Sequence, residues 1–481
     1  MKPNTCDVLI EGGLVIDGTG AKRMRADVAV AGERISAVGN LEGIEAKTKV
    51  SARDRVVTPG FIDAHTHDDR VVLSSPDMTP KISQGVTTVI AGNCGVSLAP
   101  LVDRAPPPPL NLLGDREWYR FGSMNDYAET VEANPPAVNI AIMVGHSTLR
   151  VGVMADLTKP ATRDEIDRMG ALLEESLQAG CIGMSTGLAY PTAKAAPTEE
   201  VVALAEHLAA YDGIYATHMR DEGDHLVESV EETLEIGRRA GVPVVISHHK
   251  SCKRRNWGRT RETLAMIAAA RQNQSVNLDV YPYTASSTVL LEEFVKGAER
   301  VIVTWSEAHP EVAGRDFAKV KQEWGCSTEE AISRLLPAGA IYYQMHEDDL
   351  RRVMSFTDAM IGSDGLPHDV FPHPRLWGTF PRVLGYYCRD LGLFSLEEAV
   401  RRMAAVPASV FNVKDRGVIR EGALADLVIF DPETVIDKAD FDSPKQPAAG
   451  IDLVMVNGKP VWRDFAWTGE RPGKLLRRQQ T

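Results

Sequence analysis

Residues 60–67 read Gly-Phe-Ile-Asp-Ala-His-Thr-His and overlap an apolar run that predicts a strand over residues 57–64. Because side chains alternate along an extended strand, His65 and His67 point the same way. Two imidazoles on one face at the end of a strand form a natural clamp for a metal ion. Taken alone, the pair fits two partly exposed loop histidines equally well, so the rest of the chain must decide.

The middle of the chain alternates strand-length apolar runs with longer helix-like stretches, which is the pattern of a parallel sheet with crossover helices. Eight runs have this character: residues 57–64, 87–91, 139–144, 182–185, 214–217, 244–247, 278–281 and 360–362. Eight is the strand number of a (β/α)8 barrel, whose chemistry lies at the carboxyl ends of the strands. We therefore predict an α/β protein with a (β/α)8 TIM-like barrel over residues 61–414.

The two ends of the chain differ from the middle, because short apolar runs broken by glycine indicate antiparallel β-structure. They predict one small β-sandwich domain built from residues 1–60 and 415–481. The interval between the last two strands exceeds one βα unit, which predicts an insertion over residues 286–345. It would be either a lid over the site or an ordinary surface subdomain. The basic residues Lys474, Arg477 and Arg478 predict a solvated tail.

Four polar residues follow other predicted strands in the same way as the histidine pair: Cys94, His218, His248 and Asp364. A cysteine in this position is by itself more often a small buried residue than a ligand. In a barrel, however, these strand ends meet at one mouth. Imidazole, thiolate and carboxylate groups together suit Zn2+. The sequence therefore predicts a zinc site at the mouth of the barrel.

The composition excludes several other classes of protein. The chain has 481 residues, of which 44% are hydrophobic and 25% charged, unlike a disordered chain, a collagen or a coiled coil. Its net charge of −13 argues against general nucleic-acid binding. No apolar run approaches the roughly 18 residues that span a bilayer, and the first residues lack the apolar core of a secretory signal. We expect no membrane association and a cytoplasmic location; the oligomeric state stays unknown.

The first-strand motif resembles that of the amidohydrolase superfamily, and further segments resemble the N-acyl-D-amino-acid deacylases, or D-aminoacylases. The matching segments are residues 60–67, 79–88, 92–95, 145–150, 217–222, 247–250, 279–283, 362–367, 373–378 and 425–428. They are spread over essentially the whole chain. The resemblance implies a metal-dependent hydrolase with a (β/α)8 barrel beside a small β-sandwich. It also implies that the substrate is a linear N-acyl-D-amino acid, cleaved to a D-amino acid and a carboxylate.

The resemblance also assigns ligands. It implies that Cys94, His218 and His248 hold one tight zinc ion. His65 and His67 would share the cysteine in a second, weaker site. Many amidohydrolases bridge two metals with a lysine or glutamate from the fourth strand, but here residues 183–187 read Gly-Met-Ser-Thr-Gly. This agrees with a cysteine-bridged site and leaves the occupancy of the second site open.

Two residues are expected to act on the reacting groups. Asp364 would accept the proton of the attacking water and pass it to the leaving amine. Its alternative role is a helix N-cap. Tyr190 would stabilise the developing oxyanion together with the metal, with simple packing as its alternative.

The substrate carboxylate needs donors. Those that resemble the residues used by the family are Lys250, Tyr281, Ser287 and Arg375. Solvated surface charge is the alternative for the lysine and the arginine. If this group fixes the carboxylate and the metal fixes the carbonyl, one remaining wall can select the D enantiomer.

The side-chain preference has two interpretations. Ile302 is apolar where an arginine would help an acidic substrate, which favours apolar D-side chains such as methionine, leucine or phenylalanine. The cations at residues 253–255, Lys253, Arg254 and Arg255, leave N-acyl-D-glutamate or N-acyl-D-aspartate as the alternative. A cyclic-amide hydrolase ranks lower because the fourth-strand lysine is absent. A non-catalytic scaffold ranks lowest, because every expected ligand and Asp364 are present.

Overall fold

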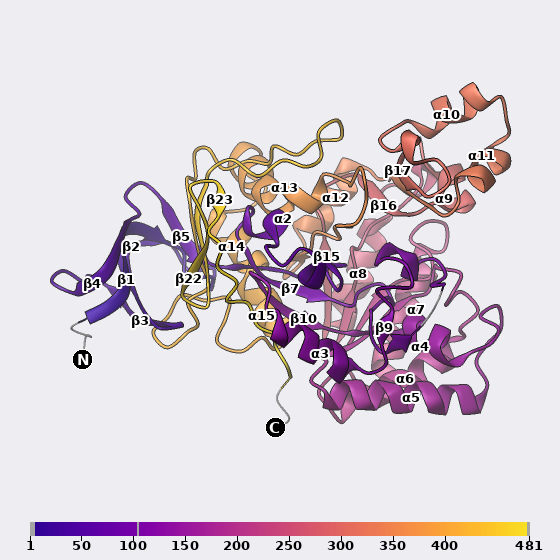
Figure 1. Ribbon diagram of the computed structural model, residues 1–481, viewed down its shortest axis with the longest axis horizontal. Helices are drawn as coiled ribbons and strands as arrows, with labels where there is room; N and C mark the ends of the chain where they lie inside the picture. The colour runs from indigo at the N-terminus through magenta and orange to yellow at the C-terminus, as the bar shows by residue number, and fades with distance from the viewer. Residues whose placement is uncertain (1–4, 103–104, 479–481) are drawn as a thin grey trace.

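The computed structural model describes residues 5–102 and 105–478. Figure 1 shows three parts along the longest axis: a β-sheet region at one end, a strand-and-helix body in the middle, and a small group of strands and helices at the other end. No helix among the described residues is long and apolar enough to cross a membrane.

The sheet region takes strands from both ends of the chain. Its first part comprises β1 (Thr5–Val15), β2 (Met24–Ala31), β3 (Arg34–Gly39), β4 (Glu45–Ser51) and β5 (Val56–Pro59). Its second part comprises β20 (Leu427–Phe430), β21 (Ile451–Val456), β22 (Lys459–Arg463) and β23 (Ala466–Trp467). The two parts join where β20 runs antiparallel to β5, with Leu427 opposite Pro59. The turn between β21 and β22 is Asn457-Gly458, both with positive φ, as a two-residue hairpin of this sequence requires.

The central body contains eight short parallel strand positions in chain order. They are β6 (Phe61–Asp63), β7 (Val86–Ala91), β10 (Asn139–Ile142) continued by β11 (Val144–Gly145), β12 (Gly183–Gly187), β13 (Ile214–His218), β14 (Val244–Ile246), β15 (Val276–Val280) and β19 (Met360–Ile361). They pair as two arcs, β6 to β10 and β11 to β19. The Ala64 N–H donates to Ile361 O at 3.2 Å and connects the last strand to the first. The Ile182 N–H donates to Ile142 O at 2.9 Å and connects the two arcs.

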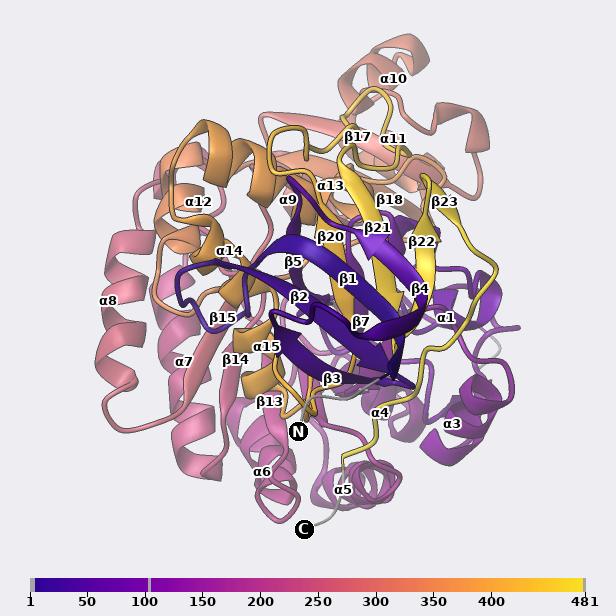
Figure 2. The ribbon, with the colours of Figure 1, turned by 90° about the vertical axis from the view of Figure 1, so that its left-hand side faces the viewer.

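Helices cover the outside of these strands, as Figure 2 shows for α5 to α8. The successive helices are α3 (Met124–Ala133), α4 (His146–Val153), α5 (Arg163–Gln178), α6 (Thr198–Ala209), α7 (Leu226–Ala240), α8 (Thr260–Ala270), α12 (Glu347–Met354), α13 (Arg375–Arg382), α14 (Leu396–Met403) and α15 (Ala405–Val410). Helix α5 illustrates why they form. Thr162 and Glu165 make a capping box at its start. Met169, Leu173 and Leu177 then recur at helical spacing and form its buried face.

The third part is inserted between β15 and β19. It contains an antiparallel sheet of β16 (Ala285–Val289), β18 (Ala338–Tyr343) and β17 (Arg300–Ser306). The helices α9 (Glu292–Gly297), α10 (Phe317–Trp324) and α11 (Thr328–Leu335) complete it. Val303, Phe317, Val320 and Leu335 belong to a separate apolar core of this segment. The inserted segment therefore has a core of its own.

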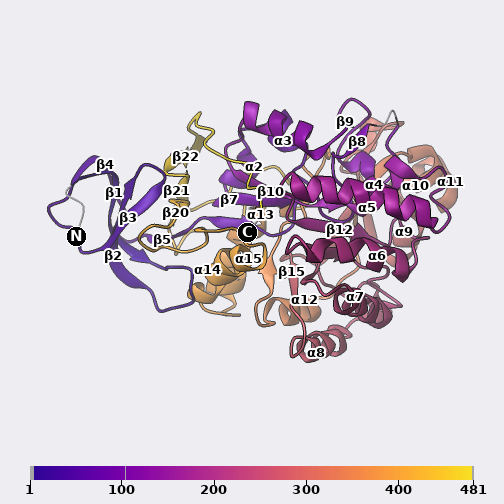
Figure 3. The same ribbon diagram turned by 90° about the horizontal axis from the view of Figure 1, so that it is seen from below.

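The C-terminal tail is bound to the protein through its backbone, while the basic side chains of Lys474 and Arg477 stay exposed. Leu475 bridges Ile140 at the start of β10, and the Leu476 N–H donates to Ile140 O at 2.7 Å. Lys474 Nζ lies 2.6 Å from Glu33 Oε2 of the sheet region. Figure 3 views the protein from below, with the strands of the sheet region on one side of β7 and α15 of the central body. The tail thus connects the sheet region to the central body.

Candidate active site

The predicted ligands lie just beyond the carboxyl ends of the strands, where the backbone turns sharply. Cys94, His248 and Asp364 have positive φ angles of 52°, 37° and 50°. Such angles are unfavourable for residues with a Cβ and persist where the surroundings impose them. The turn at Cys94 also needs a glycine, because a Cβ on Gly92 would lie 2.0 Å from Met143 O. The local backbone is therefore shaped to turn these side chains into the mouth.

Two overlapping groups of buried ligand atoms form at this mouth. One comprises His65, His67, Cys94 and Asp364, the other Cys94, His218 and His248. In each group the ligand atoms lie within 4.8 Å of one another. Cys94 belongs to both, and its Sγ lies 3.3 Å from Nε2 of His65 and 3.3 Å from Nε2 of His248. A thiolate with two imidazoles fits a zinc ion that keeps one open position.

The surrounding charges favour the ionised forms of Cys94 and Asp364. Burial raises the pKa of the Cys94 thiol, but the imidazoles of His65 and His248 outweigh burial and hold this pKa well below its usual range. Burial likewise raises the pKa of Asp364, but Arg375 and the histidines hold it well below its usual range. The Arg375 guanidinium lies 2.9 Å from Asp364 Oδ2. Both groups are therefore ionised at neutral pH.

Two carboxylates that sequence reasoning missed support the histidines from outside. Asp279 Oδ2 lies 3.3 Å from His65 Nδ1, and its Oδ1 accepts the His248 N–H at 2.9 Å. Glu222 Oε1 lies 3.0 Å from His248 Nδ1. Outer carboxylates of this kind fix the ring orientation and tautomer of metal-binding histidines. Both residues lie inside quoted motifs, but nothing in the sequence says that they face histidines.

A cavity of about 450 Å³ opens over these groups. The predicted residues on its wall are His67, Tyr190, His218, His248, Lys250, Tyr281, Ser287 and Asp364. The inserted segment contributes Ser286, Ser287, Thr288, Glu293, Phe294 and Gln344 to the same wall. Tyr190 Oη lies 2.9 Å from Thr288 Oγ1. Burial, together with the charge of Cys94, raises the pKa of Tyr190 well above its usual range, so its hydroxyl stays protonated and can donate.

The predicted carboxylate-binding residues gather around one aromatic ring. Lys250 Nζ lies 5.7 Å from the ring centre of Tyr281, and the Arg375 guanidinium carbon lies 4.5 Å from it. The Tyr281 hydroxyl and the Ser287 hydroxyl are buried without a hydrogen-bond partner, which is uncommon for buried polar groups. Arg375 is fully buried and donates to Ser287 O at 2.9 Å. In this structure the guanidinium therefore contacts Asp364 and Ser287 and does not line the cavity.

Comparison with known proteins places the chain. The model of the Amidohydrolase family matches residues 49–309 and 327–462. A D-aminoacylase from Alcaligenes xylosoxydans xylosoxydans is 54% identical, over 98% of both chains. The chain belongs to the amidohydrolase family. Within it, the resemblance to the D-aminoacylases is confirmed.

Two solved structures of this family show what such a mouth holds in relatives. One is a D-aminoacylase whose binuclear metal centre shows one-metal activation and second-metal attenuation; it is 53% identical with a TM-score of 0.97, over 98% of this chain and 100% of that one. The other is an N-acyl-D-glutamate deacylase from Bordetella bronchiseptica with zinc and a phosphonate mimic of the tetrahedral intermediate. It is 45% identical with a TM-score of 0.94, over 98% of this chain and 100% of that one. The α/β amidohydrolase fold is thus shared over nearly the whole chain.

Of the residues used to predict the side-chain preference of this amidohydrolase, the structure places Lys253 on the cavity wall and Ile302, Arg254 and Arg255 away from it. Ile302 packs in a cluster with Ala285 and Ile341 and does not line the cavity. Arg254 and Arg255 are exposed and lie near Glu299 and Asp224, respectively. Lys253 does line the cavity, but its Nζ lies 2.8 Å from Asp224 Oδ2. Ile302, Arg254 and Arg255 therefore give no support to either interpretation, and Lys253 remains on the wall as half of an ion pair.

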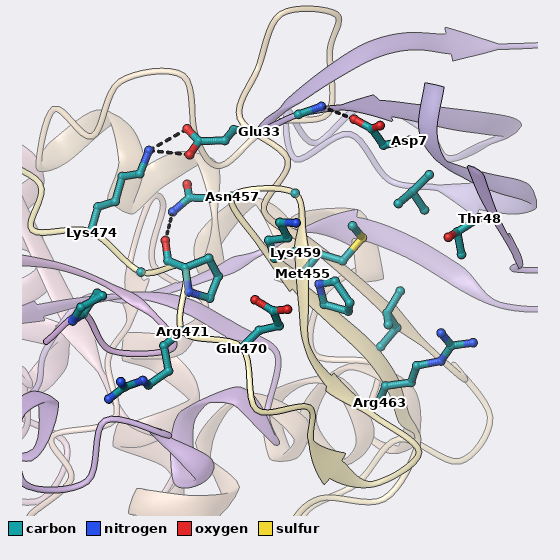
Figure 4. A pocket seen from close by; sticks show the side chains of 18 of the residues that line it. Asp7, Glu33, Thr48, Met455, Asn457, Lys459, Arg463, Glu470, Arg471 and Lys474 are labelled. Atoms are coloured by element: carbon teal, nitrogen blue, oxygen red, sulfur yellow. Dashed lines mark hydrogen bonds and ion pairs between the residues drawn. The ribbon is translucent and has the colours of Figure 1, made fainter. Parts of the chain in front are cut away.

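A second and larger hollow of about 1150 Å³ lies elsewhere on this amidohydrolase, between the sheet region and the tail. Figure 4 shows its lining, with Lys474 facing Glu33 beside Asn457. Its charged side chains pair locally, as Lys474 does with Glu33 and Lys47 with Asp7. None of the predicted catalytic, substrate or metal residues lines it.

Proposed function

We propose that the protein hydrolyses linear N-acyl-D-amino acids to a D-amino acid and a carboxylate, with Zn2+ as cofactor. One observation carries the proposal. The thiolate of Cys94 joins two histidine groups at a cavity whose wall also carries Lys250, Tyr281 and Ser287. The 54% identity to a D-aminoacylase supports the same substrate class. Cys94, His218 and His248 would hold the tight ion, and His65 with His67 would complete a weaker second site.

The chain's own residues account for the proton transfers. Zn2+ at these ligands supplies Lewis-acid activation of water and of the amide carbonyl. Asp364 is ionised and lies within the ligand group, so it can accept the proton of the attacking water. The same proton then passes to the amide nitrogen as the C–N bond breaks. The protonated Tyr190 hydroxyl donates to the carbonyl oxygen as negative charge develops there.

The carboxylate end of the substrate would bind around the ring of Tyr281. The unpartnered hydroxyls of Tyr281 and Ser287 offer two donors, and the Lys250 ammonium, which donates one N–H to Glu222 at 2.6 Å, has further N–H groups to offer. Arg375 supports this group from behind through Ser287 and Asp364. With the carboxylate and the carbonyl both fixed, the third substituent can point only to one wall, which selects the D form.

We propose that the preferred D-side chain is apolar, such as that of methionine, leucine or phenylalanine. The support is charge pairing in the outer cavity. Lys194 lies 3.0 Å from Glu293, Arg220 2.8 Å from Glu232, and Lys253 2.8 Å from Asp224, in each case measured to a carboxylate oxygen. An acidic side chain would therefore meet cations that are already neutralised. N-acyl-D-glutamate or N-acyl-D-aspartate stays the alternative.

A cyclic-amide substrate has less support. The hydroxyl of Ser185, on the fourth strand, holds the turn that carries Cys94. It donates to Gly92 O at 2.5 Å and accepts the Gly95 N–H at 2.9 Å. This side chain shapes the turn and offers no bridging ligand. Linear amides therefore remain the proposed substrates.

We also propose the finer architecture: a closed (β/α)8 barrel over residues 61–414, a β-sandwich from residues 1–60 and 415–481, and an inserted lid over residues 286–345. The hydrogen bonds of Ala64 and Ile182 support closure. Two contacts support a lid. Tyr190 is 2.9 Å from Thr288 of the insertion, and Lys194 is 3.0 Å from Glu293.

The deciding experiment measures amine release by zinc-loaded protein from N-acetyl-D-methionine and, in parallel, N-acetyl-L-methionine. We expect release from the D form alone. Silence on both methionine substrates, with release from N-acetyl-D-glutamate or N-acetyl-D-aspartate, would transfer the proposal to the acidic alternative. Equal release from both enantiomers would refute the assigned carboxylate site.

A further inference from the structure

The carboxylate of Glu222 lies between the metal-ligand candidate His248 and the substrate-binding candidate Lys250. Its Oε1 lies 2.6 Å from Lys250 Nζ and 3.0 Å from His248 Nδ1, while Lys250 Nζ lies 2.7 Å from the same Nδ1. Its side chain is only 11% exposed. The Cys252 N–H donates to the backbone oxygen of Glu222 at 2.7 Å and fixes the loop that carries it.

The geometry decides what each of these three atoms does. His248 turns Nε2 towards Cys94 Sγ, so Nε2 must keep its lone pair to act as a ligand. The proton of the neutral ring is then on Nδ1. With Nδ1 protonated, Lys250 cannot donate to it across their 2.7 Å contact, and Glu222 Oε1 is then the acceptor within reach of both nitrogens.

Without this acceptor the local hydrogen bonding would reverse. The Lys250 ammonium would donate to Nδ1, which would drive the ring proton to Nε2 and block the lone pair that faces Cys94. The ammonium would also lose the contact that holds it beside Tyr281. The same carboxylate therefore supports two different functions.

We propose that Glu222 is a positioning residue that couples the metal site to the carboxylate-binding group, by fixing the tautomer of His248 and the position of Lys250 together. This proposal rests on the proposed function of the site and adds the residue that links its two halves. Under this proposal, Lys250 affects substrate binding alone, whereas Glu222 affects both zinc binding and substrate binding.

The test uses the full-length protein and three variants: Glu222→Gln, Lys250→Met and the double variant. Zinc affinity is measured by competition with a chromophoric chelator, and D-methionine binding by calorimetry on the zinc-loaded protein. Neither measurement needs turnover. Glu231→Gln, an exposed change on helix α7, which follows Glu222 in the chain, is the matched control.

We expect Glu222→Gln to raise the zinc dissociation constant about 10- to 100-fold, as for other outer-sphere partners of histidine ligands. Lys250→Met should keep the zinc affinity of the control. Both single changes should weaken D-methionine binding, on the order of tenfold. Because Glu222 acts on D-methionine through Lys250, the double variant should bind D-methionine no more weakly than Lys250→Met does.

The proposal is overturned if Glu222→Gln matches the control in zinc affinity, or if its effect on D-methionine adds in full to that of Lys250→Met. Circular dichroism of the apo-proteins checks folding. If Glu222→Gln does not fold, Glu222→Asp replaces it, and wild-type behaviour of that shorter carboxylate in both measurements overturns the proposal equally. Absence of deacylase activity in the wild type would refute the proposed function, while the zinc measurement still decides the role of Glu222 towards His248.

Discussion

At the scale of single residues, Tyr190 separates a catalytic role from a packing role. Its ring lies against His218, with centroids 4.8 Å apart, and its hydroxyl contacts Thr288. Tyr190→Phe keeps the ring and removes the donor. We expect kcat to fall about 10²- to 10³-fold, as for other oxyanion donors, with KM changed little. Steady-state kinetics with the D substrate measure this, and an unchanged kcat would leave only the packing role.

Asp364 allows a second prediction at the same scale. Asp364→Asn keeps the size of the side chain but cannot take the proton of the attacking water. We expect kcat to fall about 10²- to 10⁴-fold. Asp364 is not among Cys94, His218 and His248, the residues proposed to hold the tight zinc ion, so one zinc per chain should remain. Full turnover with zinc bound would remove Asp364 from the mechanism.

The ligand residues were predictable from the sequence because each follows an apolar strand, and strand ends meet in a parallel barrel. Residues that act through another side chain gave no such signal. Glu222 and Asp279 are ordinary acids in the sequence, and only the fold turns them towards His248 and His65. The prediction for Ile302 was wrong. Its place in the sequence suggested the pocket for the substrate side chain, but its side chain packs into a separate apolar cluster.

At the scale of elements, a buried lysine ties the first strand to the last. Lys81 Nζ donates to Asp63 Oδ2 at 2.8 Å and to Ser363 Oγ at 2.9 Å, and it lies 3.3 Å from Asp68 Oδ2. Lys81→Met would leave these carboxylates buried without a cation. We expect a loss of about 3–5 kcal/mol in the free energy of unfolding, measured by urea denaturation.

A matched double variant tests this interpretation. Lys81→Met combined with Asp63→Asn removes a charge from each partner, so part of the lost free energy should return. A double variant that is less stable by the full sum of both single changes would show that Lys81 and Asp63 do not act as a pair.

Helices α4 and α6 are joined by a charge network with a defined pH dependence. Glu200 of α6 lies 2.9 Å from His146 Nε2 and pairs with Arg150 of α4. Burial raises the pKa of Glu200, but its hydrogen bonds to His146 and Arg150 outweigh burial and lower this pKa to about 2. A depressed carboxyl pKa stabilises the fold above the unfolded-state pKa of about 4.3, and this stabilisation is lost as the pH falls towards 2.

Glu200→Gln should therefore lower the free energy of unfolding at pH 7 by about 3 kcal/mol. It should also flatten the decline in stability between about pH 4.3 and pH 2. Urea denaturation across this pH range measures both effects. The exposed neighbour Glu199→Gln is the control, and an equally steep decline in the Glu200 variant would contradict the assignment.

At the scale of the whole molecule, the sequence predicted the alternation of strands and helices more readily than the contacts between distant segments. The pairing of β5 with β20 joins segments more than 360 residues apart, although each reads only as a short apolar run. The basic residues of the tail predicted solvated side chains. They give no signal for the hydrogen bonds that the backbone beside them makes. The binding of the tail depends on free backbone groups at Ile140 and Gly180, which only the assembled strands expose.

Removal of residues 474–481 tests what the tail contributes. The Ile140 N–H donates to Lys474 O at 2.9 Å, the Leu476 N–H to Ile140 O at 2.7 Å, and the Arg478 N–H to Gly180 O at 2.9 Å. Three net hydrogen bonds stabilise the fold by about 3 kcal/mol, so truncation should lower the melting temperature by several degrees. Ile140 lies near the start of β10 and Gly180 precedes β12, whereas the candidate ligands lie at or just beyond the opposite ends of their strands. Zinc affinity should therefore stay unchanged in the truncated protein. A loss of zinc affinity together with the loss of melting temperature would contradict this and would mean that the tail and the metal site are coupled through the barrel.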